Sequence, residues 1–185
     1  MTMTTAPVKT MTRRAGAAFA AAGIVLGMLA GCSPAEPEPT PSKTALFASE
    51  AEAFAAAEET YRAYLADLNA TDLSDDDSFR PVYDWLTDTA LSAERESLSY
   101  YYAEHLTRTG ETSFDTFSPL SHSEAKTVAN ICLDVSDVDL LDSDGRSVLP
   151  EDRPNRRALK VTFTPGDTST RLAIASNHAP EDFSC

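Results

Sequence analysis

Glycine is scarce in this sequence, and its distribution excludes several kinds of active site. The chain has 7 glycines in 185 residues, and only Gly110, Gly145 and Gly166 follow residue 31. A phosphate-binding loop needs closely spaced glycines so that the backbone can approach the phosphates. The Gly-x-Ser-x-Gly elbow of serine hydrolases and the His-Glu-x-x-His metal motif are also absent. The sequence therefore contains no standard catalytic motif.

Basic residues are outnumbered by acidic ones, 15 against 29, which gives a formal net charge of -14. Proteins that bind nucleic acid neutralise its phosphates with a basic patch. We therefore expect no nucleic-acid partner. Hydrophobic residues make up 42% of the chain, which is enough for the core of one ordinary domain.

Histidine and cysteine are equally rare, with three of each. No second His or Cys lies at the spacing typical of a metal site. Asp72, Asp75, Asp76 and Asp77 form an acidic stretch, but consecutive aspartates cannot all converge on one cation. We interpret this stretch as a solvated loop, and we expect neither a metal ion nor another cofactor.

Residues 1–31 have the pattern of a signal peptide. They contain no acidic residue, and the basic Lys9, Arg13 and Arg14 precede an apolar run over residues 15–30. A basic head, an apolar middle and small residues at the end are typical of such peptides. The alternative, an uncleaved anchor, is less favoured because a spanning helix usually needs about 20 apolar residues.

The run ends in Leu29-Ala30-Gly31-Cys32, which resembles the bacterial lipobox. The resemblance implies removal of residues 1–31 and a thioether-linked diacylglycerol on Cys32. Two acyl chains anchor a protein firmly, whereas one gives only marginal binding. We therefore predict a protein held by lipid on the outer face of the cell membrane.

Residues 32–44 form a predicted tether between this anchor and a folded domain over residues 45–185. Four of the ten residues in Ser33–Ser42 are proline. Such a composition favours an extended chain without a core.

Cys132 and Cys185 are the two cysteines that remain if Cys32 carries lipid. An extracytoplasmic compartment is oxidising enough for a disulfide between them. A pair of buried free thiols and a metal site are the alternatives.

The first half of this domain has helical periodicity. Ser49 and Glu52 fit a capping box, and the following segment repeats apolar residues at helical spacing. A short helical piece is expected over residues 81–86 and a third helix from about residue 89 to residue 109. Gly110 fits the position just beyond that third helix.

The second half alternates in period two, as strands do. We expect strands over residues 112–118, 127–141, 159–163 and 171–175, with a bulge near Ser136 and Asp137 where the alternation slips. Helices first and antiparallel strands afterwards predict an α+β domain, with three helices on one face of a curved antiparallel sheet of about four strands.

Aromatic residues with polar tips gather on the predicted helices and are typical of a ligand pocket. His105 lies one helical turn from Tyr101, and an imidazole side chain is a residue type that suits proton transfer. However, no carboxylate lies three or four residues away to orient it. Packing of the rings into the core, with their hydroxyls at its rim, is the simpler alternative. The candidate pocket comprises Tyr61, Tyr64, Tyr83, Trp85, Tyr101 and His105.

The order of helices and strands resembles the nuclear-transport-factor-2-like fold, a cone of three helices wrapped by a bent sheet. The chain is also similar to small lipoproteins of high-GC Gram-positive bacteria. That resemblance spans the lipobox, the proline-rich tether and four short segments, and it implies a Cys132–Cys185 disulfide. The segments are residues 57–64, 132–136, 152–154 and 183–185.

The resemblance supplies no catalytic residue. Members of the wider fold include isomerases and dehydratases with an Asp and a Tyr in the cone, and many domains that only bind. Our first hypothesis is a non-enzymatic lipoprotein that binds a small molecule or another envelope protein. The second is an isomerase-like or hydrolase-like enzyme that uses His105, a Tyr and an Asp inside the cone.

Overall fold

The computed structural model describes residues 45–185. The predicted signal peptide (1–31), the lipidated Cys32 and the proline-rich tether (32–44) lie outside these residues. Within residues 45–185, no helix is both long and apolar enough to cross a membrane.

Helix α1 (Glu50–Ala70) begins where the capping pattern places it. The hydroxyl of Ser49 accepts a hydrogen bond from the backbone N–H of Glu52 at 3.2 Å. The carboxylate of Glu52 in turn accepts one from the backbone N–H of Ala48 at 2.8 Å. This reciprocal arrangement satisfies donors that a helix start leaves free. A 3-10 turn (Asp76–Phe79) and the short α2 (Arg80–Asp84) follow.

Helix α3 (Asp88–Ala103) ends six residues earlier than the sequence predicts. His105 adopts a left-handed backbone conformation with φ of 54°, and its N–H donates to the carbonyl of Tyr102 at 3.1 Å. The N–H of Leu106 donates to the carbonyl of Tyr101 at 2.9 Å. These two bonds form a Schellman motif, which ends the helix and turns the chain. The prediction that the helix continues to residue 109, with Gly110 just beyond it, is therefore wrong.

The strands form two antiparallel sheets. The larger sheet has the order β2-β3-β5-β6, built from β2 (Ser113–His122), β3 (Thr127–Asp134), β5 (Arg156–Pro165) and β6 (Leu172–His178). The smaller sheet pairs β1 (Thr107–Thr109) with β4 (Asp139–Leu141). The prediction of an α+β domain with three helices and antiparallel sheets is confirmed.

The expected strand over residues 127–141 is two strands, and the predicted bulge is a tight turn. The N–H of Val138 donates to the carbonyl of Val135 at 3.1 Å, and the chain leaves the larger sheet there. The guanidinium of Arg153 holds this turn by donating to the carbonyls of Val135 and Val138 at 3.0 and 2.9 Å. The slip in alternation therefore marks a change of sheet.

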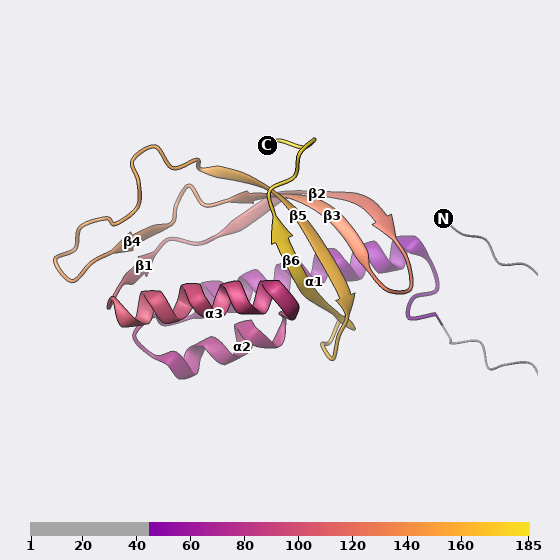
Figure 1. The fold of residues 1–185 in the computed structure, drawn as a ribbon, viewed down its shortest axis with the longest axis horizontal. Coiled ribbons are helices and arrows are strands. Elements are labelled where there is room, and N and C mark those ends of the chain that lie inside the picture. Colours follow the sequence, from indigo (N-terminus) through magenta and orange to yellow (C-terminus); the bar gives the residue numbers. More distant parts are fainter. Residues whose placement is uncertain (1–44) are drawn as a thin grey trace, which may run out of the picture. The chain divides into compact units, whose positions relative to one another are not determined.

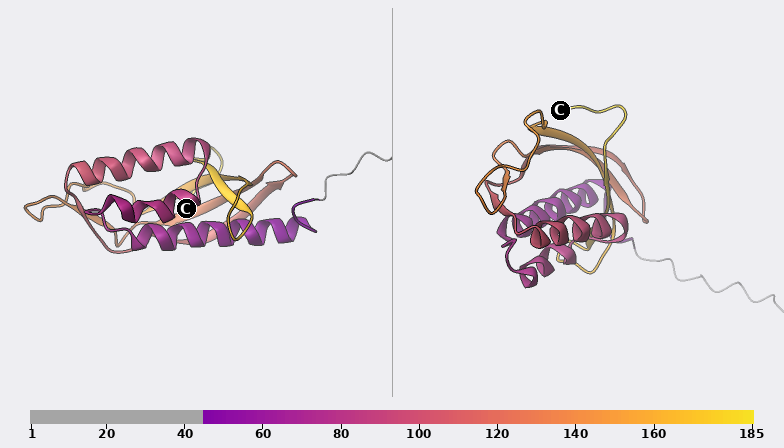
Figure 2. Two further views of the ribbon diagram at one scale, coloured as in Figure 1. Left: turned by 90° about the horizontal axis from the view of Figure 1, so that it is seen from below. Right: turned by 60° about the vertical axis from the view of Figure 1, so that its left-hand side comes forward.

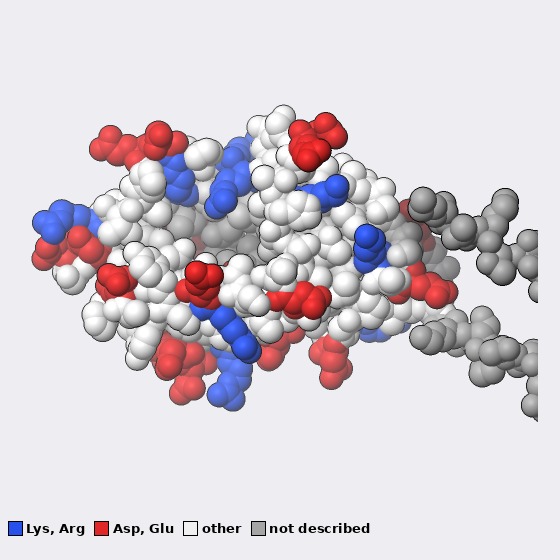
Figure 3. Space-filling model, viewed as in Figure 1, with Lys and Arg blue, Asp and Glu red and all other residues white. Residues whose placement is uncertain are grey.

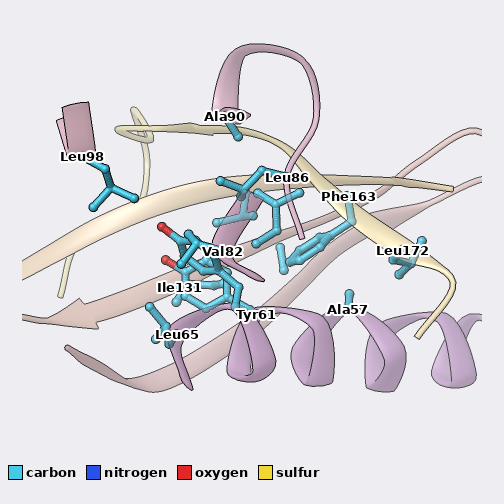
Figure 4. Packing of buried hydrophobic residues seen from close by; sticks show 14 of the residues in the cluster. Ala57, Tyr61, Leu65, Val82, Leu86, Ala90, Leu98, Ile131, Phe163 and Leu172 are labelled. Carbon is cyan, nitrogen blue, oxygen red and sulfur yellow. The ribbon is translucent and has the colours of Figure 1, made fainter. Parts of the chain in front are cut away.

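The helices cover one face of the four-stranded sheet, and the sheet bends over α1 and α3 (Figures 1 and 2). We call this covered face the inner face. The core lies in this layer, where Tyr61 of α1, Val82 of α2 and Leu98 of α3 meet Ile131 and Phe163 of the sheet (Figure 4). Each of these five side chains is at most 1% exposed, so the layer excludes water.

A disulfide joins Cys132 of β3 to Cys185, with their Cα atoms 5.7 Å apart. This confirms the pairing that the cysteine count and the resemblance imply. Cys132 is two residues from Asn130 and alternates with Ile131, so the bridge lies on the outer face of the sheet, opposite the helices.

Candidate functional site

A cavity of about 270 Å³ lies between α1, α3 and the inner face of the sheet. Leucine side chains from these elements, from β4 and from loops, with the valines of the β3–β4 turn, form its apolar wall. In Figure 3 the surface between the upper strands and α3 is hollowed, with Lys or Arg side chains above the hollow and Asp or Glu side chains below it. The polar residues that line the cavity are Tyr61, Tyr64, Glu94, Ser97, Tyr101, Arg108, Thr112, Arg153, Arg157 and Asn177.

Glu94 supplies a carboxyl group to this cavity. Its neighbours Leu91, Leu98 and Tyr101 lie three, four and seven residues away, so all four share one face of α3. The carboxylate accepts a hydrogen bond from the hydroxyl of Tyr64 on α1 at 3.0 Å. Burial raises the pKa of Glu94, although the hydrogen bond from Tyr64 and the charge of Arg108 oppose the shift. The site therefore favours the neutral form of this carboxyl more than water does.

Three tyrosines surround Glu94. Burial, and after it the negative charge of Glu94, raise the pKa values of Tyr61, Tyr64 and Tyr101 above the ordinary tyrosine value. All three hydroxyls are therefore protonated at neutral pH and can donate, and that of Tyr64 already donates to Glu94. The ring of Tyr61 is fixed between the rings of Tyr64 and Phe114, with centroids 5.7 and 5.4 Å away.

Three guanidinium groups also line the cavity. Arg108 donates to the carbonyl of Asn69 at 2.9 Å and Arg153 to that of Val138 at 2.9 Å, so backbone carbonyls hold both groups in place. Arg157 lines the cavity from β5 while it remains exposed, so it stands at the opening. The cavity thus joins an apolar wall to three guanidinium groups, a carboxyl group and tyrosine hydroxyl groups.

This arrangement suits a small molecule with an apolar body and a polar head group. Tyrosine hydroxyls donate hydrogen bonds, and Glu94 accepts them when ionised and also donates one when neutral. Residues 45–185 contain no group of three or more His, Cys, Asp or Glu side chains placed to hold a metal ion.

The structure brings together three of the six residues in the candidate pocket, namely Tyr61, Tyr64 and Tyr101. It does not bring Tyr83, Trp85 or His105 to this cavity. His105 is exposed because α3 ends before it. No aspartate lines the cavity either, so the combination of His105, Tyr and Asp expected for an enzyme is not assembled.

Tyr83 and Trp85 are held elsewhere by specific contacts. The guanidinium of Arg95 lies over the ring of Tyr83 at 5.1 Å, and the indole N–H of Trp85 donates to Asp67 at 2.6 Å. The backbone at Trp85 also accepts a hydrogen bond from the N–H of Ile174 at 2.9 Å. This contact attaches the α2–α3 connection to the edge of β6.

Glu94 and the three arginines are the functional candidates that the sequence interpretation missed. A signal for Glu94 was present, because it interrupts the apolar stripe of α3 between Leu91 and Leu98. A charged residue inside such a stripe is rarely buried without a partner. The arginines left no comparable signal, because two of them follow irregular loops and are placed only by tertiary contacts.

No family model matches the chain, and no curated protein matches it. Among solved structures, it is similar to a proposed aromatic ring hydroxylase from Novosphingobium aromaticivorans, with 12% identity, a TM-score of 0.46, and coverage of 70% of this chain and 88% of that one. It is also similar to a Catenulispora acidiphila protein solved in complex with S-DNPA, with 15% identity and a TM-score of 0.46. That match covers 70% of this chain and 92% of the other protein's chain.

A third similar structure is the intermembrane space region of the chloroplast protein ARC6, with 14% identity and a TM-score of 0.42. That match covers 66% of this chain and 92% of the other protein's chain. At TM-scores below 0.5 the shared chain path is partial. The α+β assignment therefore rests on the helices and strands of this chain.

Replacement of Glu94 by Gln is expected to stabilise the protein increasingly as pH rises. The pKa of Glu94 is raised from its ordinary value of 4.5, so its contribution to stability is fully present below that value and is lost as pH rises through the folded-state pKa. Gln keeps the acceptor for Tyr64 but carries no charge, so it avoids this loss. Urea unfolding of both proteins over a pH series measures the difference.

The matched control is Glu96→Gln, because Glu96 is exposed on the same helix. Its effect should not grow in the same way with pH. An advantage of Glu94→Gln that is as large below pH 4.5 as above the folded-state pKa would contradict a raised pKa for this carboxyl.

Proposed function

We propose that this chain is an extracytoplasmic lipoprotein whose domain binds a small organic molecule in the cavity around Glu94. Cys32 carries the lipid, residues 32–44 are the tether, and the domain is a nuclear-transport-factor-2-like cone. In this proposal the lipoprotein is of the kind found in high-GC Gram-positive bacteria. The observation that carries the binding function is the Tyr64–Glu94 hydrogen bond inside a cavity with an apolar wall of leucine and valine side chains.

The first support for ligand binding is the free-energy cost of placing the Glu94 carboxyl in this site. A carboxyl in an apolar site destabilises a fold unless it is paired or neutralised. Among residues 45–185, Glu94 has no ion pair within salt-bridge distance, and Tyr64 is its hydrogen-bond donor. A ligand that hydrogen-bonds to Glu94 and contacts the leucine wall offsets that cost when it binds.

The size and chemistry of the cavity define the ligand class. Its volume of about 270 Å³ is close to the lower limit of small-molecule pockets, about 300 Å³. We expect a molecule of one or two rings whose hydroxyl or carbonyl group meets Tyr64 and Glu94. An acidic group on the same molecule would lie near Arg157 at the opening.

The anchor and tether support a binding role at the cell surface. A lipobox cysteine places the chain on the membrane, and a proline-rich segment holds the domain away from it. The acidic surface repels anionic headgroups, which also favours a domain that faces the surroundings. Another envelope protein is the alternative partner if the cavity carries no small molecule.

Mass spectrometry of the protein, extracted in mild detergent from the membranes of its own host, tests both the lipid anchor and the bound small molecule. Under denaturing conditions we expect a chain that begins at Cys32 and carries a diacylglycerol. Under native conditions we expect a further mass that is released on unfolding. An unmodified Cys32 would overturn the anchor, and a native mass without addition would overturn the small-molecule proposal.

A cavity-filling variant gives the matched control. Ser97 lines the cavity on α3, whereas Ser92 lies exposed on the same helix. Ser97→Trp is expected to lose the retained mass, and Ser92→Trp is expected to keep it. Circular dichroism of both variants checks that each is folded. Equal retention by the two variants would place the molecule outside this cavity.

An acid–base enzyme is the second candidate, and the raised pKa values of Tyr64 and Glu94 favour it. Perturbed carboxyls in pockets are typical of proton transfer. In that case the wild-type protein converts the released molecule and Glu94→Gln does not. A molecule that both proteins return unchanged favours binding alone.

A further inference from the structure

A second cavity, of about 440 Å³, lies beneath the last residues of the chain. We call residues 179–185 the C-terminal strap. The strap runs over the outer face of the four-stranded sheet, on the side away from the helices (Figure 1). The Cys132–Cys185 disulfide joins its end to β3. This cavity is therefore separated from the one around Glu94 by the thickness of the sheet.

A row of directly paired polar residues crosses all four strands of the sheet, and part of this row forms the floor of the outer cavity. Ser118 of β2 pairs with Asn130 of β3, Asn130 pairs with Lys160 of β5, and Lys160 pairs with His178 of β6. Directly paired residues present their side chains on the same face. Asn130, Lys160 and His178 line the cavity.

Asn130 is the most unusual member of the row. Its side chain is 8% exposed, and its Oδ1 atom is fully buried with no hydrogen-bond partner among residues 45–185. Within that range it is the one side-chain nitrogen or oxygen atom in this condition. Buried acceptors almost always have a donor, so an N–H or O–H group from outside the chain is expected here.

Charges of both signs border the cavity without neutralising each other. Lys160 contributes an ammonium group from the floor, and Glu181 and Asp182 contribute carboxylates from the strap. No salt bridge joins these three residues within the described part of the chain. Leu120, which is 48% exposed, and Phe183 add apolar surface.

We infer that the cavity beneath the C-terminal strap binds a small zwitterion of the amino-acid type. Its carboxylate pairs with Lys160, beside His178, and its ammonium group pairs with the carboxylates of the strap, next to Asn130. Its apolar side chain contacts Leu120 and Phe183. This inference does not depend on the proposed function, because no residue of this cavity lines the one around Glu94.

Isothermal titration of the full chain in detergent with L-leucine tests the inference. N-acetyl-L-leucine keeps only the carboxylate and L-leucinamide keeps only the ammonium group, so they are the matched ligands. We expect L-leucine to bind about tenfold or more tightly than either, because each loses one charged hydrogen-bonding partner. No heat with L-leucine, or equal affinity for a one-charge analogue, would overturn the inference.

Two lysine variants locate the binding. Lys160→Met removes the proposed carboxylate partner, while Lys126→Met removes an exposed lysine outside this cavity. We expect Lys160→Met to weaken L-leucine binding about tenfold or more and Lys126→Met to leave it unchanged. Equal effects would place the ligand elsewhere. Glu94→Gln, which alters the inner cavity, is expected to bind L-leucine as the wild type does.

Discussion

Replacement of Cys185 by Ser is expected to lower the free energy of unfolding by about 4 kcal/mol. The disulfide closes a loop with a sequence separation of 53 residues, which contains the whole of β5 and β6. The cross-link limits the conformations of the unfolded chain, and this loss of entropy grows with loop length. In urea, the midpoint of unfolding should fall by about 2 M if the slope is about 2 kcal/mol/M.

Two controls separate the effect of losing the disulfide from the effect of changing a side chain at the C-terminus. Wild-type protein under reducing conditions should unfold at the same midpoint as Cys185→Ser, because both lack the cross-link. Ser184→Ala, next to the bridge in an exposed position, should unfold like the oxidised wild type. A midpoint that is insensitive to both reduction and Cys185→Ser would show that the C-terminal strap adds nothing to folding.

The second large effect is expected in the core, where Phe163→Ala should destabilise the fold by about 3 to 5 kcal/mol. Phe163 is 0% exposed on β5, and its ring lies 6.4 Å from that of Phe117 on β2. Figure 4 shows it between Leu86 and Leu172, at the centre of the layer between helices and sheet. Its removal loses buried apolar surface and leaves a cavity that the packed neighbours cannot fill.

Val148→Ala is the matched truncation at the surface, because Val148 is 47% exposed. Its effect should remain within about 0.5 kcal/mol. Thermal and urea unfolding of both variants provide the measurement. A Phe163→Ala protein as stable as Val148→Ala would mean that the sheet and helices do not pack as described.

Local patterns were sufficient for the elements whose signals lie within a few residues. The capping box around Ser49 located the start of α1, because its hydrogen bonds join residues close in sequence. The alternation of Ala129, Ile131 and Leu133 identified β3, because one face of that strand is in the core. Helical spacing likewise placed Tyr61 and Tyr64 on the buried side of α1.

The mistakes lie where tertiary contacts decided the backbone. The helical pattern continues past Ala103, but burial of Leu106 and pairing of β1 with β4 favour a turn at His105. Strand alternation continues past Asp134, but Arg153 from a later loop fixes a turn there. In both places a distant segment provides the stabilising contact, and periodicity does not contain that information.

The candidate site divides in the same way. The sequence by itself determined the acidic composition, the lipobox pattern, the helix-then-strand order, the even pair Cys132 and Cys185, and the tyrosines of α1. These depend on residue type and short spacing. Only the tertiary structure decided that Glu94 of α3 faces Tyr64 of α1, that His105 faces solvent, and that Asn130 lies beneath the C-terminal strap. Those positions depend on how elements far apart in sequence pack together, because burial and charge at a site come from all the segments that surround it.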